Sequence, residues 1–173
     1  MVQQGSKHPV VEATKDAREN DTVVLPAGTT IKIRPVSAAL VDAVMGRIKN
    51  PPVPTVVEEE TGKVIENPGS PQYIEALQEA TRKRTNATID AFVMFGIDLP
   101  NGLPSDTAWV GKLKYLVRLG HLELGDFDLD DPVDLEFLYK RYIVANADII
   151  QRISGASGVS GEEIEAAEAS FRS

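Results

Sequence analysis

The sequence lacks cysteine and is poor in histidine, and these two shortages remove several kinds of chemistry. Without a thiol there are no disulfides, no thiol nucleophile and no zinc site built on thiolates. The two histidines, His8 and His121, are far apart and have no neighbours at the spacing of a transition-metal site. We therefore expect neither thiol chemistry nor a bound transition metal.

Long apolar runs and an excess of basic charge are also missing. No stretch approaches the roughly 18 to 20 apolar residues of a membrane span, and residues 1–20 contain no apolar core of a secretion signal. Acidic residues outnumber basic ones by 26 to 18, so the formal net charge is −8. This charge disfavours binding to nucleic acid or to anionic membranes, and it suits a partner with a basic or amphipathic surface. We predict a cytoplasmic protein that binds other proteins.

Turn residues and apolar periodicity predict a single domain over residues 21–153, preceded by a weakly ordered tail over residues 1–20. At the start of the domain, two short β-forming runs flank a turn at Gly28, and Pro35 ends the second run. This predicts a β-hairpin. Turn residues recur around Gly62, where the alternatives are a solvated loop and a second small hairpin.

Helical patterns fill the rest of the domain, and the predicted fold class is α+β, mainly α: an N-terminal hairpin followed by a bundle of about four helices. The expected helices are 37–48 with Ser37 as its cap, 71–96 with a bend or break at its polar centre 81–86, one from Ser105 or Asp106 to Gly120, and 131–153. We expect the third of these helices to turn Leu116 and Val117 inward.

After residue 153 the composition changes to glycine and serine, which predicts a flexible linker over residues 154–161. Residues 162–173 then carry Ile164, Ala167 and Phe171 on one side of a short amphipathic helix. So short a helix is marginal alone, so we predict that these three residues bind a partner. The alternative is that the segment folds back on its own core or frays.

The acidic segment before the last helix is the best metal candidate. Asp126, Asp128 and Asp130 alternate like the first ligands of a calcium loop, but Asp131 stands where the loop needs glycine and Phe137 where it needs glutamate. We therefore favour a solvated loop and a helix N-cap at Asp131 over a calcium-regulated binding module.

No catalytic constellation is evident, so we predict that the protein is not an enzyme and uses no cofactor. The glycines of residues 155–161 are not followed by the lysine of a phosphate loop, and neither histidine lies near a serine elbow motif. The only dense basic cluster is Arg82 to Arg84. It is interpreted as a solvated helix face, with contact to an acidic partner or to the chain's own acidic loop as the alternative.

Three segments carry a family resemblance: residues 24–37 (VLPAGTTIKIRPVS), residues 66–73 (ENPGSPQY) and residues 128–142 (DLDDPVDLEFLYKRY). Together with the order of the elements, over most of residues 20–153, they resemble the tail assembly chaperones of long-tailed bacteriophages and prophages. The resemblance implies a nonenzymatic protein of the host bacterial cytoplasm. It would coat the tape-measure protein, help recruit tail-tube subunits, and be absent from the finished particle. Self-association is compatible with that role.

The main alternative is a structural component of the virion, either a head–tail connector or a minor tail protein. Such a protein would remain in the purified particle, whereas a chaperone would not.

Overall fold

The computed structural model describes residues 21–158. Its small antiparallel sheet has the strand order β1-β2-β5, with β1 at Thr22–Val24, β2 at Thr30–Ile33 and β5 at Ile97–Asp98. The predicted hairpin is confirmed: Val23 pairs with Ile31, and the turn uses a positive φ of 82° at Gly28. On the other edge of β2, Ile33 pairs with Ile97. The two-residue strand β5 thus joins the end of the longest helix to the hairpin.

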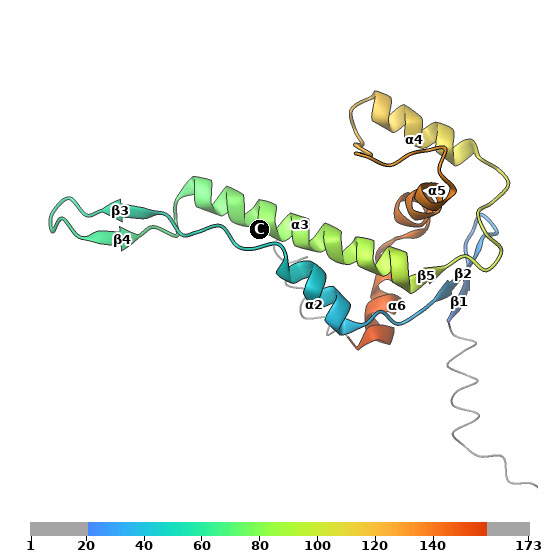
Figure 1. The fold of residues 1–173 in the computed structure, drawn as a ribbon, viewed down its shortest axis with the longest axis horizontal. Helices are drawn as coiled ribbons and strands as arrows, with labels where there is room; N and C mark the ends of the chain where they lie inside the picture. The colour runs from blue at the N-terminus through green and yellow to red at the C-terminus, as the bar shows by residue number, and fades with distance from the viewer. Residues whose placement is uncertain (1–20, 159–173) are drawn as a thin grey trace, which may run out of the picture.

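Two helices lie side by side along the length of the molecule, α2 (Ala38–Gly46) and α3 (Pro71–Gly96) (Figure 1). Ser37 holds the N-cap position of α2, but its side chain makes no capping hydrogen bond. In α3 the Ser70 hydroxyl accepts a hydrogen bond from the Tyr73 N–H. The expected bend or break at residues 81–86 is wrong, because α3 is continuous through that stretch.

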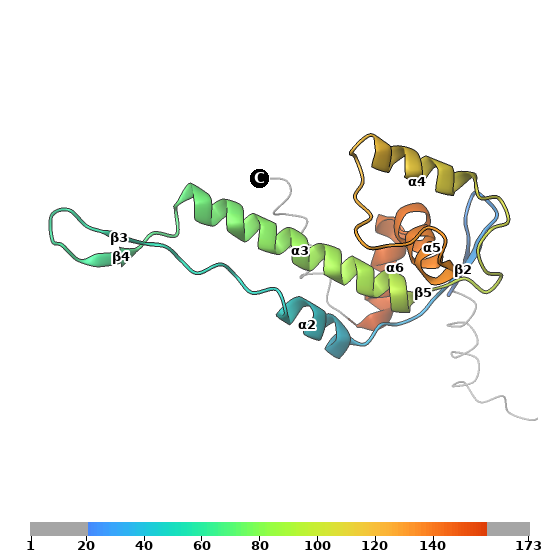
Figure 2. The same ribbon diagram turned by 45° about the horizontal axis from the view of Figure 1, so that its top comes forward.

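A second hairpin projects from the N-terminal end of α3, away from the rest of the molecule (Figures 1 and 2). It consists of β3 (Thr55–Val57) and β4 (Val64–Glu66), joined by a turn with a positive φ of 66° at Gly62. These strands form a sheet of their own and do not pair with the first hairpin. We call residues 55–66 the hairpin arm, and residues 21–49 together with 71–158 the body.

Helix α4 (Ala108–Arg118) begins next to Asp106, whose carboxylate accepts a hydrogen bond from the Ala108 N–H, and a positive φ of 73° at Gly120 follows its end. Its buried face consists of Trp109 and Leu113. The expected inward position of Leu116 and Val117 is wrong: 41% and 38% of their surface is exposed. The helix therefore packs through a narrower stripe than its sequence suggests.

The predicted continuous helix over 131–153 is also wrong. The structure has α5 (Pro132–Tyr139), one π-helical turn (Lys140–Val144) and then α6 (Ala147–Ser157). The Ala145 N–H donates to the Lys140 carbonyl, which closes the π turn, and the Asn146 side chain accepts from the Ile149 N–H to start α6. Because α6 continues to Ser157, residues 154–157 are helical and the predicted linker at 154–161 does not begin at residue 154.

The core forms where the sheet, the C-terminal half of α3, α5 and α6 meet. Its fully buried side chains include Ile31, Phe92, Leu138 and Ile153. Phe137 is half-buried and stacks on Phe127 with 5.0 Å between ring centroids.

Gly96 is required by close packing. A Cβ at this position would lie 2.7 Å from Cγ2 of Ile153 and 3.1 Å from Cγ2 of Val36. Glycine therefore lets the end of α3 approach α6. The fold is α+β with a small sheet followed by helices, as predicted.

Candidate interaction surfaces

The carboxylates of the acidic loop accept hydrogen bonds from backbone N–H groups of the same segment. The Asp131 carboxylate accepts hydrogen bonds from the N–H groups of Val133 and Asp134 at 2.7 and 3.3 Å, which confirms the predicted N-cap. Asp134 in turn accepts from the Asp128 N–H at 2.8 Å, and Asp128 accepts from the Asp130 N–H at 2.9 Å. Over residues 21–158, no three acidic or histidine side chains gather where they could hold a metal ion.

Several polar side chains of the body form hydrogen bonds or ion pairs that link one part of the fold to another. Tyr139 Oη lies 2.8 Å from Thr29 Oγ1 and links α5 to the first hairpin. The Arg141 guanidinium donates to Asp90 at 2.8 Å and links the π turn to α3. The ammonium of Lys140, itself largely buried, pairs with Glu136 one turn earlier.

The basic cluster of α3 divides into two roles. Arg82 and Lys83 pair with Glu79 on the same helix, and the hydrogen bond from Arg82 lowers the pKa of the Glu79 carboxyl below its usual value. Arg84 instead reaches α2, where its guanidinium donates to the Ile48 carbonyl at 2.9 and 2.6 Å and to the Asn50 side chain at 2.6 Å. Arg84 therefore ties α3 to the chain that follows the C-terminal end of α2, and it does not contact the acidic loop.

A hollow runs along the N-terminal half of α3. Its described lining comes from that helix alone and combines Glu75, Glu79 and Arg82 with two glutamines, Thr81, an alanine and a leucine. This described lining contains no histidine, serine or lysine. We assign it no chemistry.

The hairpin arm is an exposed apolar surface. Val57 and Val64 face each other across the two strands, and 63% and 68% of their surface is exposed. On the opposite face Val56 and Ile65 form the next pair, exposed to 41% and 45%. No described element covers either face. Single exposed apolar residues are ordinary, but four on one small hairpin are typical of a surface that another molecule covers.

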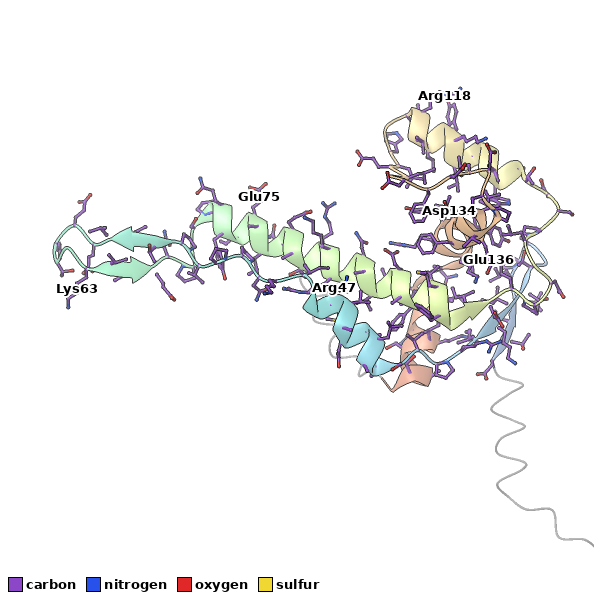
Figure 3. The ribbon with its side chains drawn as sticks, in the orientation of Figure 1. Arg47, Lys63, Glu75, Arg118, Asp134 and Glu136 are labelled. Carbon is purple, nitrogen blue, oxygen red and sulfur yellow. The ribbon has the colours of Figure 1, made fainter. Side chains whose placement is uncertain are left out.

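The outer side of α4 is the second such surface. Tyr115 on that side is exposed to 58%, and Leu119, just after the helix, to 49%. Arg118 lies at the C-terminal end of this helix and points away from the body (Figure 3). The same figure places Lys63 at the far tip of the hairpin arm.

The residues predicted to bind a partner, Ile164, Ala167 and Phe171, lie outside the described residues. Sequence reasoning did not select the hairpin arm or the outer face of α4. The sequence of the arm did carry a signal. On each side of the turn at Gly62, a β-forming run has two consecutive apolar residues, which point to opposite faces of a hairpin. The sequence of α4 carried a weaker signal, because this helix has more apolar residues than a single buried stripe can hold.

None of the helices over residues 21–158 is long and apolar enough to cross a membrane. Comparison of the chain with protein-family models, with curated proteins and with solved structures finds no match.

Proposed function

We propose that this protein is a nonenzymatic phage tail assembly chaperone that binds the tape-measure protein and helps recruit tail-tube subunits in the host bacterial cytoplasm. The observation that carries the proposal is the pair of exposed apolar surfaces, one on the hairpin arm and one on α4. The resemblance of residues 24–37, 66–73 and 128–142 to that family supplies the partner.

A chaperone of a long helical protein must cover apolar helix surface reversibly. Two modest apolar patches suit this task, because each contributes little alone and both act together on an extended partner. The net charge of −8 keeps the free protein soluble and disfavours nucleic acid.

The test is co-expression with a tape-measure protein from the same genome. We expect the two to co-purify and the soluble yield of the tape-measure protein to rise. Replacing Val57 and Val64 by serine should reduce both effects. Val24→Ser is the matched control, since Val24 is exposed to 67% on β1 in the body, and it should leave both effects unchanged.

Failure to co-purify, with unchanged solubility of the tape-measure protein, would contradict the proposal. Mass spectrometry of purified virions separates the alternative. A chaperone is absent from the particle, whereas a head–tail connector or a minor tail protein is present at a fixed number of copies.

A further inference from the structure

The hairpin arm combines apolar faces with an acidic turn. Between Thr55 and Glu66 there are four glutamates and one lysine, which give a formal charge of −3. Glu59 and Glu60 lie exposed at the tip, and none of the ion pairs among residues 21–158 includes them. A two-stranded hairpin without a covered face is marginal in water. Its chemistry therefore suits a partner that is both apolar and basic.

The outer side of α4 has that chemistry. At the helical period, Gly111, Tyr115 and Leu119 form one row, and the rows beside it carry basic residues. The basic side chains are exposed, belong to none of the ion pairs of the described chain, and give the helix a formal charge of +3, since it has no acidic residue; they are Lys112, Lys114 and Arg118.

Gly111 adds an independent observation. It lies in the interior of α4, where glycine destabilises a helix by about 1 kcal/mol relative to alanine. A Cβ at this position would have nothing within 4 Å, so no close approach within the described chain requires glycine there. The absence of a side chain leaves a flat place beside Tyr115, where the backbone of an extended segment from another molecule could approach closely.

The two surfaces lie far apart in the same molecule. Both ribbon views place the hairpin arm at one end and α4 toward the other (Figures 1 and 2). The arm of one copy therefore cannot cover its own α4, but it can cover the α4 of a second copy. Because two copies with a net charge of −8 repel each other, they associate only where the local charges are opposite, and these two surfaces meet that condition.

We propose that the protein associates head to tail, with the hairpin arm of one copy docked on the outer face of α4 of the next. The contact is heterologous, since each copy uses two different surfaces, and it generates a ring or an open chain of copies. Each contact is small, so the association of two copies is weak and longer assemblies form as the protein concentration rises. This inference requires no tape-measure protein and stands on the charges and exposed faces alone.

The test reverses the charge of each surface in turn. In the full-length chain, Lys112→Glu with Lys114→Glu makes the α4 face acidic, and Glu59→Lys with Glu60→Lys makes the arm tip basic. We expect the wild type to form oligomers in sedimentation velocity up to millimolar concentration, and each variant alone to sediment as a monomer. An equimolar mixture of the two variants should restore association, because every arm then meets an α4 face of opposite charge.

Two further variants sharpen the test. Gly111→Gln favours the helix but fills the flat place, so it should reduce association while raising the melting temperature slightly. Arg47→Glu with Lys49→Glu is the matched control: it makes the same change of charge at exposed positions at the end of α2 and should associate as the wild type does.

Three outcomes would overturn the proposal. The wild type could stay monomeric at all concentrations, or the charge-reversed variants could associate as strongly as the wild type. In the third, a chain shortened by residues 159–173, which include four glutamates, could lose association. That result would name the acidic C-terminal segment as the occupant of α4 in place of the hairpin arm. Circular dichroism of each variant separates loss of association from loss of fold.

Discussion

In the body, side chains of β2, α3, α5 and α6 lie fully buried against one another, whereas every residue of the hairpin arm is exposed. Phe92 and Ile31 have no accessible surface, while Val57 and Val64, also apolar, are about two-thirds exposed. Burial of apolar surface is the main term that stabilises a fold. The comparison indicates that the body folds on its own apolar surface, whereas the arm buries none of its apolar side chains against the rest of the described chain.

The largest expected effect separates a body residue from an arm residue. Phe92→Ala leaves a cavity among fully buried neighbours and should lower the free energy of unfolding by about 3–5 kcal/mol. Val57→Ala, at an exposed position, should change it by less than about 0.5 kcal/mol. Urea denaturation of both variants at low protein concentration checks the difference. Similar losses from the two variants would show that the arm shares the core of the body.

The contact between α3 and α6 gives a second test of the body. Gly96→Ala places a methyl group against Ile153 and should cost about 1–3 kcal/mol through overpacking. Gly46→Ala is the control, because its Cβ would meet nothing within 4 Å, and it should be neutral or stabilising by up to about 1 kcal/mol. Thermal unfolding compares the two. If Gly96→Ala matched Gly46→Ala in stability, the close approach of α3 and α6 would be wrong.

A smaller effect is expected where α2 meets α3. Arg84→Gln removes the guanidinium hydrogen bonds to the Ile48 carbonyl and should lower the free energy of unfolding by about 1 kcal/mol. Arg82→Gln breaks only an exposed, solvent-screened pair within α3, so it should lower the free energy of unfolding less. Chemical denaturation should therefore rank Arg84→Gln as the more harmful change, and the reverse order would contradict the assigned role of Arg84.

The smallest effect concerns pH. Because the folded state lowers the pKa of Glu79, mainly through the hydrogen bond from Arg82, its contribution to stability is present above the ordinary carboxyl pKa. That contribution is lost as the pH falls through the lowered value. The melting temperature of Glu79→Gln should lie slightly below that of the wild type at neutral pH and converge with it in acid. A difference in melting temperature between the two proteins that widened in acid would contradict the predicted sign of this contribution.

Local signals in the sequence predicted the parts of the fold that local chemistry determines. The two β-forming runs around Gly28 gave the first hairpin, and the cap at Asp131 gave the start of α5. Strand β5 has only two residues and exists because it pairs with β2. Beside this pairing, the side chains of Arg34 and Asp98, which are 64 positions apart, are hydrogen-bonded. No local pattern in the sequence therefore reveals the strand.

The errors have a related cause. The polar centre of α3 suggested a break, but the helix is continuous there, and Arg84 finds its partner at Ile48, just after the end of α2. Conversely, helical spacing through residues 131–153 concealed the cap at Asn146, where one helix ends and another begins. Neither interaction surface was selected, because exposure of an apolar residue depends on which elements pack beside it.

Hydrogen–deuterium exchange of the full-length protein tests the central claim most directly, since it reports on body and arm in one experiment. In dilute protein we expect slow exchange at Ile31 and Phe92 and fast exchange across residues 55–66. At high protein concentration, or with the tape-measure protein added, the arm and the outer face of α4 should gain protection together. Arm amides as protected as Phe92 in dilute protein would contradict the account.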